Sequence, residues 1–493
     1  MLPAPVLDPE SEVPLYRQLH GHVRELIGTG RLRPGDRLPS TRDLAGHLGL
    51  NRTTVSAAYE LLETEGLIRG HVGRGSFVTG SVPSESSGLD WAEVLESWDR
   101  GSLPQPAAAP EEMISFATSR PADHLFPIDE FRATCREVVA AEGAAAILQL
   151  GSPSGYGPLR DYLIDQGREE GVAGAGDDVV VTNGCQQAMD LIQRVLLRPG
   201  DTVLLEDPVY PGAKSVFARA GARVVGVPVG AQGMDLEHLE RAIAREKPRL
   251  LVVTPNFQNP TGATLPLAAR RTILEMVREA RVVLVENDIY GALRYEGEPL
   301  PTLKQLDDTG DTVLLRSYSK LAFPGLRVGW VTGPHALSGR LAEAKQFTDL
   351  HSDQLSQAVL LRFAESGRLA AHRARIVAAG AERLSAVIEA CGRYLPDGTR
   401  LTRPQGGMNL WVRLPQPLDA GELLARAHQE NVSYLPGKYF EVSRHDPGGL
   451  RLSFAGLTPE KIRAGVAILG GIFSSELERA RASRHFDPAP AMV

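Results

Sequence analysis

The chain has 493 residues, of which 43% are hydrophobic and 23% charged, and its formal net charge is −7. At roughly 150 residues per domain, this length indicates more than one compact unit, and the acidic balance means that any contact with nucleic acid needs a locally basic region. Three scattered cysteines and the lack of zinc-like Cys/His spacing exclude a disulfide framework and predict no metal site.

The N-terminus and the lengths of the apolar runs indicate where in the cell the protein is expected. The first residues lack a basic region followed by an apolar one, so no signal peptide is expected. No run of about 18 apolar residues occurs, so no membrane span is expected either. A cytoplasmic protein is therefore predicted.

Residues 11–79 form the first expected domain. Apolar residues at helical spacing and turn residues between them predict helices over residues 15–27, 42–49 and 52–66 and a β-hairpin over residues 67–78. Ser40 and Asn51 are expected to cap the second and third helices. This order of elements predicts a winged helix-turn-helix of the α+β class.

The same 69 residues are basic, with nine arginines, no lysine and seven acidic residues. Arg42, Arg52, Thr53 and Thr54 fall at helix N-termini, where backbone N–H groups and side chains can grip phosphate while the helix enters the major groove. Arg74 stands between two glycines at the wing tip, where it can reach the minor groove. The alternative is a helical packing module whose arginines are solvated surface charges.

The stretch from residue 30 to residue 78 closely resembles the GntR-family winged helix. The resemblance implies binding to double-stranded operator DNA, with Arg42, Arg52 and Arg74 as contacts. It does not identify the operator.

Composition changes after residue 79. Residues 80–112 are rich in Pro, Ser and Ala and predict a linker that contains one short helix over residues 89–98. Residues 113–475 are expected to form the large domain, and residues 476–493 a C-terminal tail.

The large domain alternates β-branched apolar runs with helical stretches. The runs lie at residues 179–184, 202–207, 222–229, 250–256, 282–288 and 312–319. This alternation predicts an α/β fold with a mostly parallel sheet covered on both faces. Such sheets bind ligands at the carboxyl ends of their strands.

Lys320, one of only seven lysines, follows such a strand end in the run LLRSYSKLAFPGLRVGW. Ser317 and Ser319 precede it, and Arg327 follows seven residues later. Two hydroxyls and a guanidinium beside a lysine suit a phosphorylated aldehyde that the lysine holds as a Schiff base.

Upstream, the run VVVTNGCQQAMDLI reads as strand, glycine turn and helix start. Gly184, Cys185 and Gln186 can therefore aim backbone N–H groups at the same phosphate. The Cys185 side chain is expected to be a bystander, since no base lies near it in the sequence.

Two further strand ends carry polar residues. Tyr210 can stack its ring on a pyridine, although a buried core tyrosine is the plainer interpretation. Asn259 can donate its amide to a phenolic oxygen, although Asn-Pro turns are usually structural.

Together, residues 113–473 resemble fold-type I pyridoxal 5′-phosphate (PLP) enzymes of the aminotransferase class I and II group. With the winged helix in front, the chain resembles the MocR/GabR-type subfamily of the GntR transcription regulators. The resemblance implies an aminotransferase-like α/β domain with a smaller C-terminal α+β subdomain, and a homodimer.

The resemblance also implies residue roles. Lys320 forms the aldimine, Ser317, Ser319 and Arg327 hold the phosphate, and Tyr210 stacks on the ring. Asn259 and Tyr290 share the phenolic oxygen. Arg451, in GLRLSFA, binds the α-carboxylate of an amino-acid ligand; the alternative is a surface arginine on a strand.

Two positions depart from the family pattern. Family members have Asp at the position of Asn287, where it keeps the pyridine nitrogen protonated; a neutral Asn is a weaker partner and slows proton removal from Cα. A one-residue shift would let Asp288 replace it, although strand alternation points Asp288 to the other face. Leu150 stands where the family often has a Tyr that reaches the phosphate of the neighbouring subunit. Its loss is expected to loosen cofactor retention, unless Tyr156 substitutes.

Three functions remain open at this point. The first is a regulator that senses PLP, an amino acid or an amine through Lys320 and changes its affinity for DNA. The second is an active aminotransferase with an accessory DNA-binding domain, which Asn287 disfavours. The third is a DNA binder in which Lys320 has no role.

Overall fold

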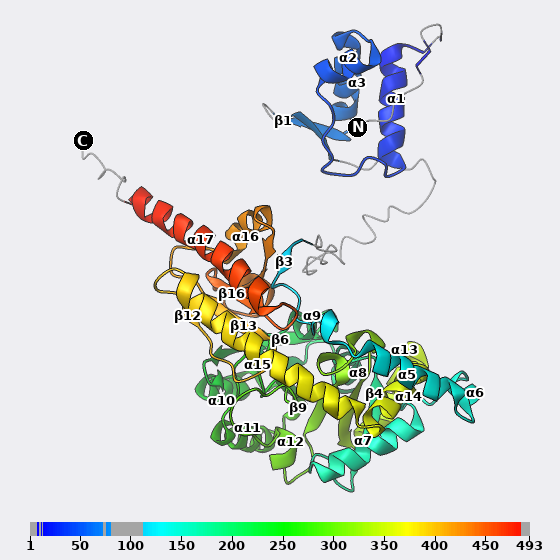
Figure 1. Ribbon diagram of the computed structural model, residues 1–493, viewed down its shortest axis with the longest axis vertical. Helices are drawn as coiled ribbons and strands as arrows, with labels where there is room; N and C mark the ends of the chain where they lie inside the picture. The colour runs from blue at the N-terminus through cyan, green and yellow to red at the C-terminus, as the bar shows by residue number, and fades with distance from the viewer. Residues whose placement is uncertain (1–6, 9–10, 12, 72–74, 80–111, 485–493) are drawn as a thin grey trace. The chain divides into compact units, whose positions relative to one another are not determined.

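The computed structural model describes residues 7–8, 11, 13–71, 75–79 and 112–484. The chain divides into two compact units, residues 1–100 and 101–493 (Figure 1). The predicted linker helix over residues 89–98 lies outside the described residues. No described helix combines the length and the apolar character needed to cross a membrane.

The first unit is the predicted winged helix-turn-helix. Its elements are α1 (Leu15–Gly28), α2 (Thr41–Leu48), α3 (Arg52–Thr64), β1 (Ile68–His71) and β2 (Gly75–Val78). The two strands pair antiparallel, and Arg37 forms a bridge with Phe77 beside them. Leu19, Val55 and Leu62 are buried in the shared core of the helices, so the three helices pack around one apolar centre.

The predicted caps of the winged helix are confirmed. Ser40 Oγ accepts the Asp43 N–H at 3.1 Å, and Asn51 Oδ1 accepts the Thr53 N–H at 3.2 Å. Gly49, with φ +64°, ends α2 in the left-handed region that glycine adopts without strain. These local signals fix where α2 ends and α3 begins.

The second unit is built on the predicted, mostly parallel sheet. Its strands are β4 (Asp177–Thr182), β5 (Thr202–Asp207), β6 (Arg223–Gly230), β7 (Gly233–Met234), β8 (Leu250–Val253), β9 (Val283–Asn287), β10 (Val313–Ser317) and β11 (Gly329–Pro334). They lie in the order β4-β11-β10-β9-β8-β5-β6-β7. β11, which the sequence pattern did not predict, runs antiparallel between β10 and β4.

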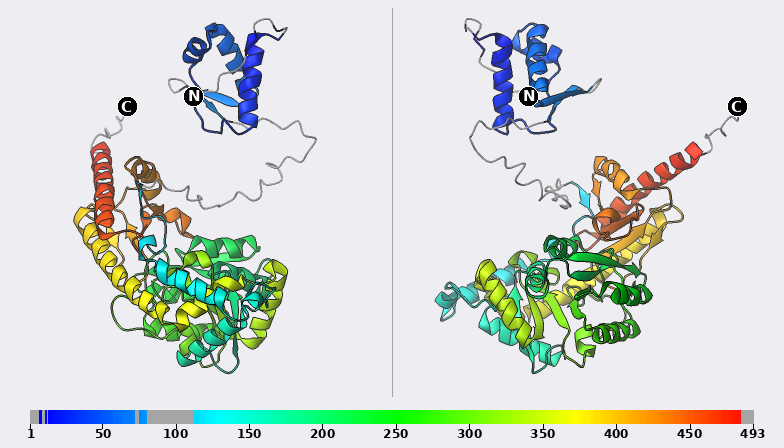
Figure 2. Two further views of the ribbon diagram at one scale, coloured as in Figure 1. Left: turned by 45° about the vertical axis from the view of Figure 1, so that its right-hand side comes forward. Right: turned by 180° about the vertical axis from the view of Figure 1, so that it is seen from behind.

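Helices cover both faces of this sheet (Figure 2). They are α5 (Ile128–Ala140), α6 (Ala144–Ile147), α7 (Gly157–Glu169), α8 (Cys185–Leu196), α9 (Pro211–Arg219), α10 (Leu236–Glu246), α11 (Leu267–Ala280), α12 (Leu303–Leu306), α13 (His335–Asp349) and α14 (Gln354–Glu365). Val285 packs on the face with α8, α9 and α13, and its neighbour Leu284 packs on the face with α10 and α11. Burial on both faces confines polar residues to the strand ends.

A smaller subdomain follows. The 27-residue α15 (Arg368–Tyr394) runs from the large sheet to a four-stranded antiparallel sheet, in the order β12 (Arg400–Leu401), β13 (Asn409–Arg413), β16 (Gly449–Ser453) and β15 (Leu435–Pro436). α16 (Ala420–Gln429) and α17 (Pro459–Arg484) pack on it. This is the expected C-terminal α+β subdomain.

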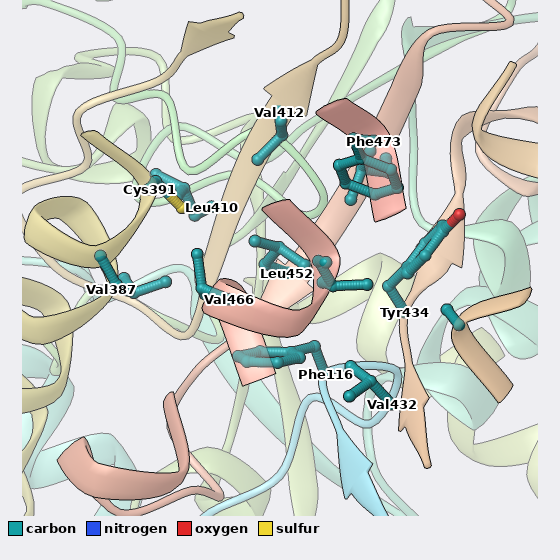
Figure 3. Close-up of a cluster of buried hydrophobic side chains, with 14 of the residues drawn as sticks. Phe116, Val387, Cys391, Leu410, Val412, Val432, Tyr434, Leu452, Val466 and Phe473 are labelled. Atoms are coloured by element: carbon teal, nitrogen blue, oxygen red, sulfur yellow. The ribbon is translucent and has the colours of Figure 1, made fainter. Parts of the chain in front are cut away.

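One segment far from the subdomain in sequence joins its core. β3 (Ile114–Ser115), at the start of the second unit, pairs parallel with β14 (Val432–Ser433). Phe116 follows β3 and lies among the buried side chains of this core (Figure 3). α17 continues beyond residue 476, where a tail was expected, and Leu477 is buried in the same core.

His372 on α15 is fully buried, and neither ring nitrogen has a hydrogen-bond partner among the described residues. Its ring stacks on Phe323, with ring centroids 6.0 Å apart. Burial, with the nearby charge of Arg375, lowers the pKa of His372 from 6.5 to about 4. The neutral ring therefore fits this apolar pocket and the protonated ring does not.

We predict that the stability of the second unit falls as the pH drops from about 6.5 towards 4, since the unfolded chain then binds the proton more tightly. The loss attributable to this ring is about 3 kcal/mol. Urea unfolding at pH 7 and pH 4.5 measures it, and His372→Phe should reduce the pH dependence. The control His238→Phe, at a half-exposed ring on α10, should leave it unchanged; equal slopes in all three proteins would contradict the prediction.

Candidate functional site

The winged helix presents its predicted DNA-contact residues at the starts of two helices. Arg42 is exposed in the first turn of α2, Arg52 and Thr53 are exposed in the first turn of α3, and Thr54 is half-buried. These positions leave the side chains free to meet phosphates and base edges. Arg74 lies outside the described residues.

In the second unit, the predicted cofactor residues follow the ends of β4, β5, β8, β9 and β10. These five strands point the same way, so their carboxyl ends meet at one edge of the sheet. Lys320 and Arg327, which lie between β10 and β11, and Asp288, which follows β9, all act electrostatically on the Cys185 thiol. The fold therefore gathers residues that are far apart in the sequence.

Lys320 lies in a short 3-10 turn after β10. Its Nζ donates to the carbonyl oxygen of Ser119 at 2.6 Å and lies 6.0 Å from the centre of the Tyr290 ring. Among the described residues, no carboxylate pairs with this ammonium group. A backbone carbonyl thus holds the amine that was predicted to bind an aldehyde.

The residues predicted to hold a phosphate, called the phosphate cradle below, lie around the start of α8. Gly184, with φ +82°, precedes the helix, and Arg327 Nη2 donates to the Asn183 carbonyl at 3.0 Å. Ser317 Oγ lies 2.9 Å from Ser319 Oγ and accepts the Ser319 N–H at 3.0 Å. A helix N-terminus, two hydroxyls and a guanidinium together make an anion site.

Neighbouring side chains border the cradle. The Cys185 thiol is 3.6 Å from the Arg316 carbonyl oxygen, and burial raises its pKa to about 12, so it is not a thiolate nucleophile. Gln186 Nε2 donates to the Gly212 carbonyl at 3.2 Å, while its Oε1 is buried without a partner among the described residues. Tyr210 is 37% exposed, and only a glycine at 212 leaves room for its ring.

Arg451 on β16 is buried beside the same edge. Its guanidinium donates to Asn259 Oδ1 at 3.1 Å and to the Ala117 carbonyl, and it lies 5.0 Å from the Phe440 ring centre. Its Nε has no partner among the described residues, and no described carboxylate pairs with it. Burial lowers the pKa of Arg451 to about 10. The alternative of a surface arginine does not fit this environment.

Comparison with known families covers both units. Residues 132–469 match the model "Aminotransferase class I and II", and residues 15–78 match "Bacterial regulatory proteins, gntR family". The probable rhizopine catabolism regulatory protein MocR of Rhizobium meliloti is 30% identical over 476 residues, which cover 95% of each chain. The chain belongs to the MocR-type GntR regulators. The uncharacterized HTH-type transcriptional regulator YdcR of Escherichia coli (strain K12) is 30% identical and aligns with 94% of this chain and 99% of its own.

This MocR-type chain is also similar to aminotransferases over its second unit. The 2-aminoadipate transaminase of Thermus thermophilus is 39% identical over 73% of this chain and 89% of its own. The crystal structure of LysN, the α-aminoadipate aminotransferase of Thermus thermophilus, in complex with N-(5′-phosphopyridoxyl)-L-leucine, covers 79% of this chain and 100% of its own. Its TM-score is 0.73 and its identity 36%. The predicted fold class and PLP as the cofactor are confirmed.

The residues of this MocR-type site fit PLP. Gln186 Oε1, Asn287 Oδ1 and Arg451 Nε are buried at one sheet edge without partners among the described residues. Beside them lie an anion cradle and a lysine that donates to a backbone carbonyl. Unpaired buried polar atoms are costly, so this set is arranged for a polar ligand.

Asn287 and Asp288 face different surroundings. Asn287 lies two residues after Val285 and opposite Leu315, so it belongs to the sheet face that α8 covers. Asp288 accepts Asn256 Nδ2 at 2.9 Å and pairs with Arg316 Nε at 3.3 Å. The carboxylate is thus engaged by two neighbours, and the amide occupies the side of the phosphate cradle.

Leu150 and Tyr156 also differ in their surroundings. Leu150 is 80% exposed. Tyr156 is half-buried and packs against apolar side chains of its own unit, next to α7.

Several site residues were not predicted from the sequence. The carbonyls of Ala117 and Ser119 leave no signal, because any residue carries a backbone carbonyl. Glu206 and Thr254 do leave one: each is a polar residue at the end of an apolar run, and both are buried.

Gly184→Ala tests the cradle. A Cβ there would lie 2.6 Å from Arg327 Nη2, and the φ of +82° would strain any other residue. We expect PLP to bind at least about tenfold more weakly, as a titration of visible absorbance would show. The control Gly325→Ala meets no atom within 4 Å and has no positive φ, so it should bind like the wild type; equal affinities in both variants would refute the cradle.

Proposed function

We propose that this MocR-type chain is a transcription regulator that binds operator DNA through its winged helix and senses PLP, or an amino acid or amine together with it, at Lys320. One observation carries the proposal. The two cations expected to bind the ligand, Lys320 and Arg451, are both held by backbone carbonyls of a single segment, residues 116–120.

The proposed cofactor contacts follow the site geometry. When bound, PLP supplies an aldehyde that reacts reversibly with amines. Lys320 would provide the amine, and the helix N-terminus, the two serines and Arg327 would hold the phosphate. Tyr210 would cover the ring, and Asn259 and Tyr290 would flank it. The full set is Gly184, Cys185, Gln186, Tyr210, Asn259, Asn287, Tyr290, Ser317, Ser319, Lys320 and Arg327. The Asp288 carboxylate is bound by Asn256 and Arg316, so Asp288 would support the site indirectly.

Arg451 is the proposed binder of an α-carboxylate. It is a buried cation whose Nε is unpaired and whose guanidinium has only neutral acceptors among the described residues. A carboxylate would satisfy both needs, since a planar guanidinium offers it two parallel hydrogen bonds. This supports an amino-acid effector over a simple amine.

The 116–120 segment is the proposed route from ligand to output. Phe116, whose side chain is buried (Figure 3), anchors the segment. Its N–H donates to the Ser433 carbonyl, and its own carbonyl accepts the Ser453 N–H. A ligand that takes Lys320 and Arg451 away from the carbonyls releases the rest of the segment. In chain order, this segment follows β3 near the start of the second unit.

A homodimer is proposed from an exposed apolar patch. Leu148 and Leu150 are 78% and 80% exposed, and Phe347 and Leu350 are also exposed. Gln354, the first residue of α14, donates to the carbonyl of residue 149 at 2.7 Å, which ties the first pair to the helix that begins four residues after Leu350. Exposed apolar clusters of this kind usually mark protein interfaces.

An active aminotransferase is the second candidate, favoured by the 39% identity to a protein named as a transaminase. Rapid, complete conversion of the cofactor to its amine form by several amino acids in a single turnover would support it. Asn287 in place of the family's Asp disfavours fast turnover.

Operator binding tests the regulator. With a duplex selected from a random pool by the full-length chain, PLP alone or with an amino-acid panel should change the Kd at least about tenfold, as a typical allosteric coupling does. Hydrogen exchange at residues 116–120 should rise in the same samples. Lys320→Ala should abolish both effects, and the exposed control Lys438→Ala should retain them. An unchanged Kd under every ligand would exclude the regulator, and regulation intact in Lys320→Ala would favour a DNA binder without a cofactor role.

Arg52→Ala tests the winged helix. Loss of one phosphate contact should weaken binding to all duplexes and reduce the slope of log Kd against log salt by about one. The control Arg340→Ala removes an exposed charge from the other unit and should keep the slope. A slope equal to that of wild type would exclude a phosphate contact by Arg52.

A further inference from the structure

The carboxylate of Asp349, the last residue of α13, accepts hydrogen bonds from three side chains. Lys345 Nζ, one turn earlier on the same helix, donates to Oδ1 at 2.7 Å. Asn183 Nδ2 and Gln187 Nε2 donate to Oδ2 at 2.8 and 2.7 Å. Because all three groups donate, position 349 needs a side chain that only accepts, as an ionised carboxylate does.

These contacts join α13 to the start of α8. Gln187 lies in the first turn of α8, and its Oε1 accepts the Asn183 N–H at 2.8 Å. Asn183 immediately precedes Gly184, and its carbonyl accepts Arg327 Nη2 at 3.0 Å. Asp349 therefore holds the residue that binds Arg327 as well as the first turn of the helix whose N-terminus belongs to the phosphate cradle.

The backbone also fixes the end of α13. The Asp349 carbonyl accepts the His351 N–H at 2.7 Å, and Leu350 between them has φ +62° and ψ −60°. A γ-turn of this hand is rare and strained for a residue other than glycine. Strained backbone persists only where neighbouring contacts hold it, and the three hydrogen bonds to Asp349 are such contacts.

Lys345 makes the Asp349 carboxylate compatible with an anion nearby. The lysine side chain is fully buried and pairs with Asp349. Without the ammonium group, the carboxylate would place a negative charge behind a site for a phosphate and weaken phosphate binding by repulsion. A buried ion pair usually adds little net stability, so stability alone does not account for this one.

We propose that Asp349 and Lys345 are positioning residues for the phosphate of PLP, because they hold Asn183 and Gln187 in place behind the phosphate cradle. This inference rests on the proposed cofactor site. Asp349 acts through its hydrogen bonds, and Lys345 acts through the charge that it neutralises. The pair should therefore strengthen the binding of the phosphate and leave the reaction of Lys320 with an aldehyde unchanged.

The test compares PLP with pyridoxal, which has the same aldehyde but no phosphate, on the full-length chain. Visible absorbance of the bound ligand gives the Kd of each. Asp349→Asn keeps the shape of the side chain but replaces one acceptor with an NH2 group. It should weaken PLP binding at least about tenfold and pyridoxal binding less than about twofold. Glu343→Gln, which removes a charge from the exposed pair with Arg340 on the same helix, is the matched control and should bind both ligands like the wild type.

A double substitution gives a rescue. When Lys345→Met is combined with Asp349→Asn, the ammonium donor is gone, so the amide oxygen can accept from Asn183 and Gln187 without a clash at the NH2 group. We expect this variant to bind PLP at least about threefold more tightly than Asp349→Asn alone, since the two positions are coupled. Independent effects would instead make its binding weaker than that of either single variant.

Two results would overturn this inference alone. One is a PLP affinity in Asp349→Asn equal to that in Glu343→Gln. The other is an equal loss of affinity for PLP and pyridoxal, which would show a general loosening of the unit. If Asp349→Asn fails to fold, Gln187→Leu breaks the same link from α8: a selective loss of PLP affinity would support the inference, and an equal loss or none would overturn it. Failure of the wild type to bind PLP would instead overturn the proposed function, and this inference with it.

Discussion

The parallel register of five strands governs this protein's second unit. β4, β5, β8, β9 and β10 point the same way and are buried on both faces, so the middle of each strand is apolar and its polar residues stand near the ends. Polar residues are tolerated only where the strands end, and all these ends lie on one edge. The phosphate cradle, Lys320 and Asn287 lie together because of this constraint.

Within that edge, the two key cations lack carboxylate partners among the described residues. Lys320 and Arg451 donate instead to backbone carbonyls and an amide oxygen. An arginine paired with a buried carboxylate would gain little free energy by exchanging it for a ligand, because the pair is already neutral and its hydrogen bonds are made. Carbonyl partners accept the N–H groups but do not neutralise the positive charge. An anionic ligand that replaces them would therefore bind favourably.

The strand parity at the end of β9 decides which side chain faces the proposed cofactor site. Glu286 and Asn287 are neighbours, yet Glu286 accepts backbone N–H groups from the start of α12 at 2.8 and 2.9 Å, while Asn287 belongs to the opposite face. A one-residue slip would exchange them. The ladder with β8 and β10 prevents it, because both neighbours fix the register of β9.

The sequence by itself determined much of this protein. Helical periodicity, the caps at Ser40 and Asn51 and the apolar runs predicted the winged helix and the sheet, since these signals are local. The run around Lys320 predicted the cofactor. Tertiary structure alone decided the contacts of the 116–120 segment and the partners of Asp288. These link elements tens to hundreds of residues apart, and backbone carbonyls have no residue signature. β11 was also not predicted, because its position depends on antiparallel pairing with β10 and β4 and not on its own residue pattern.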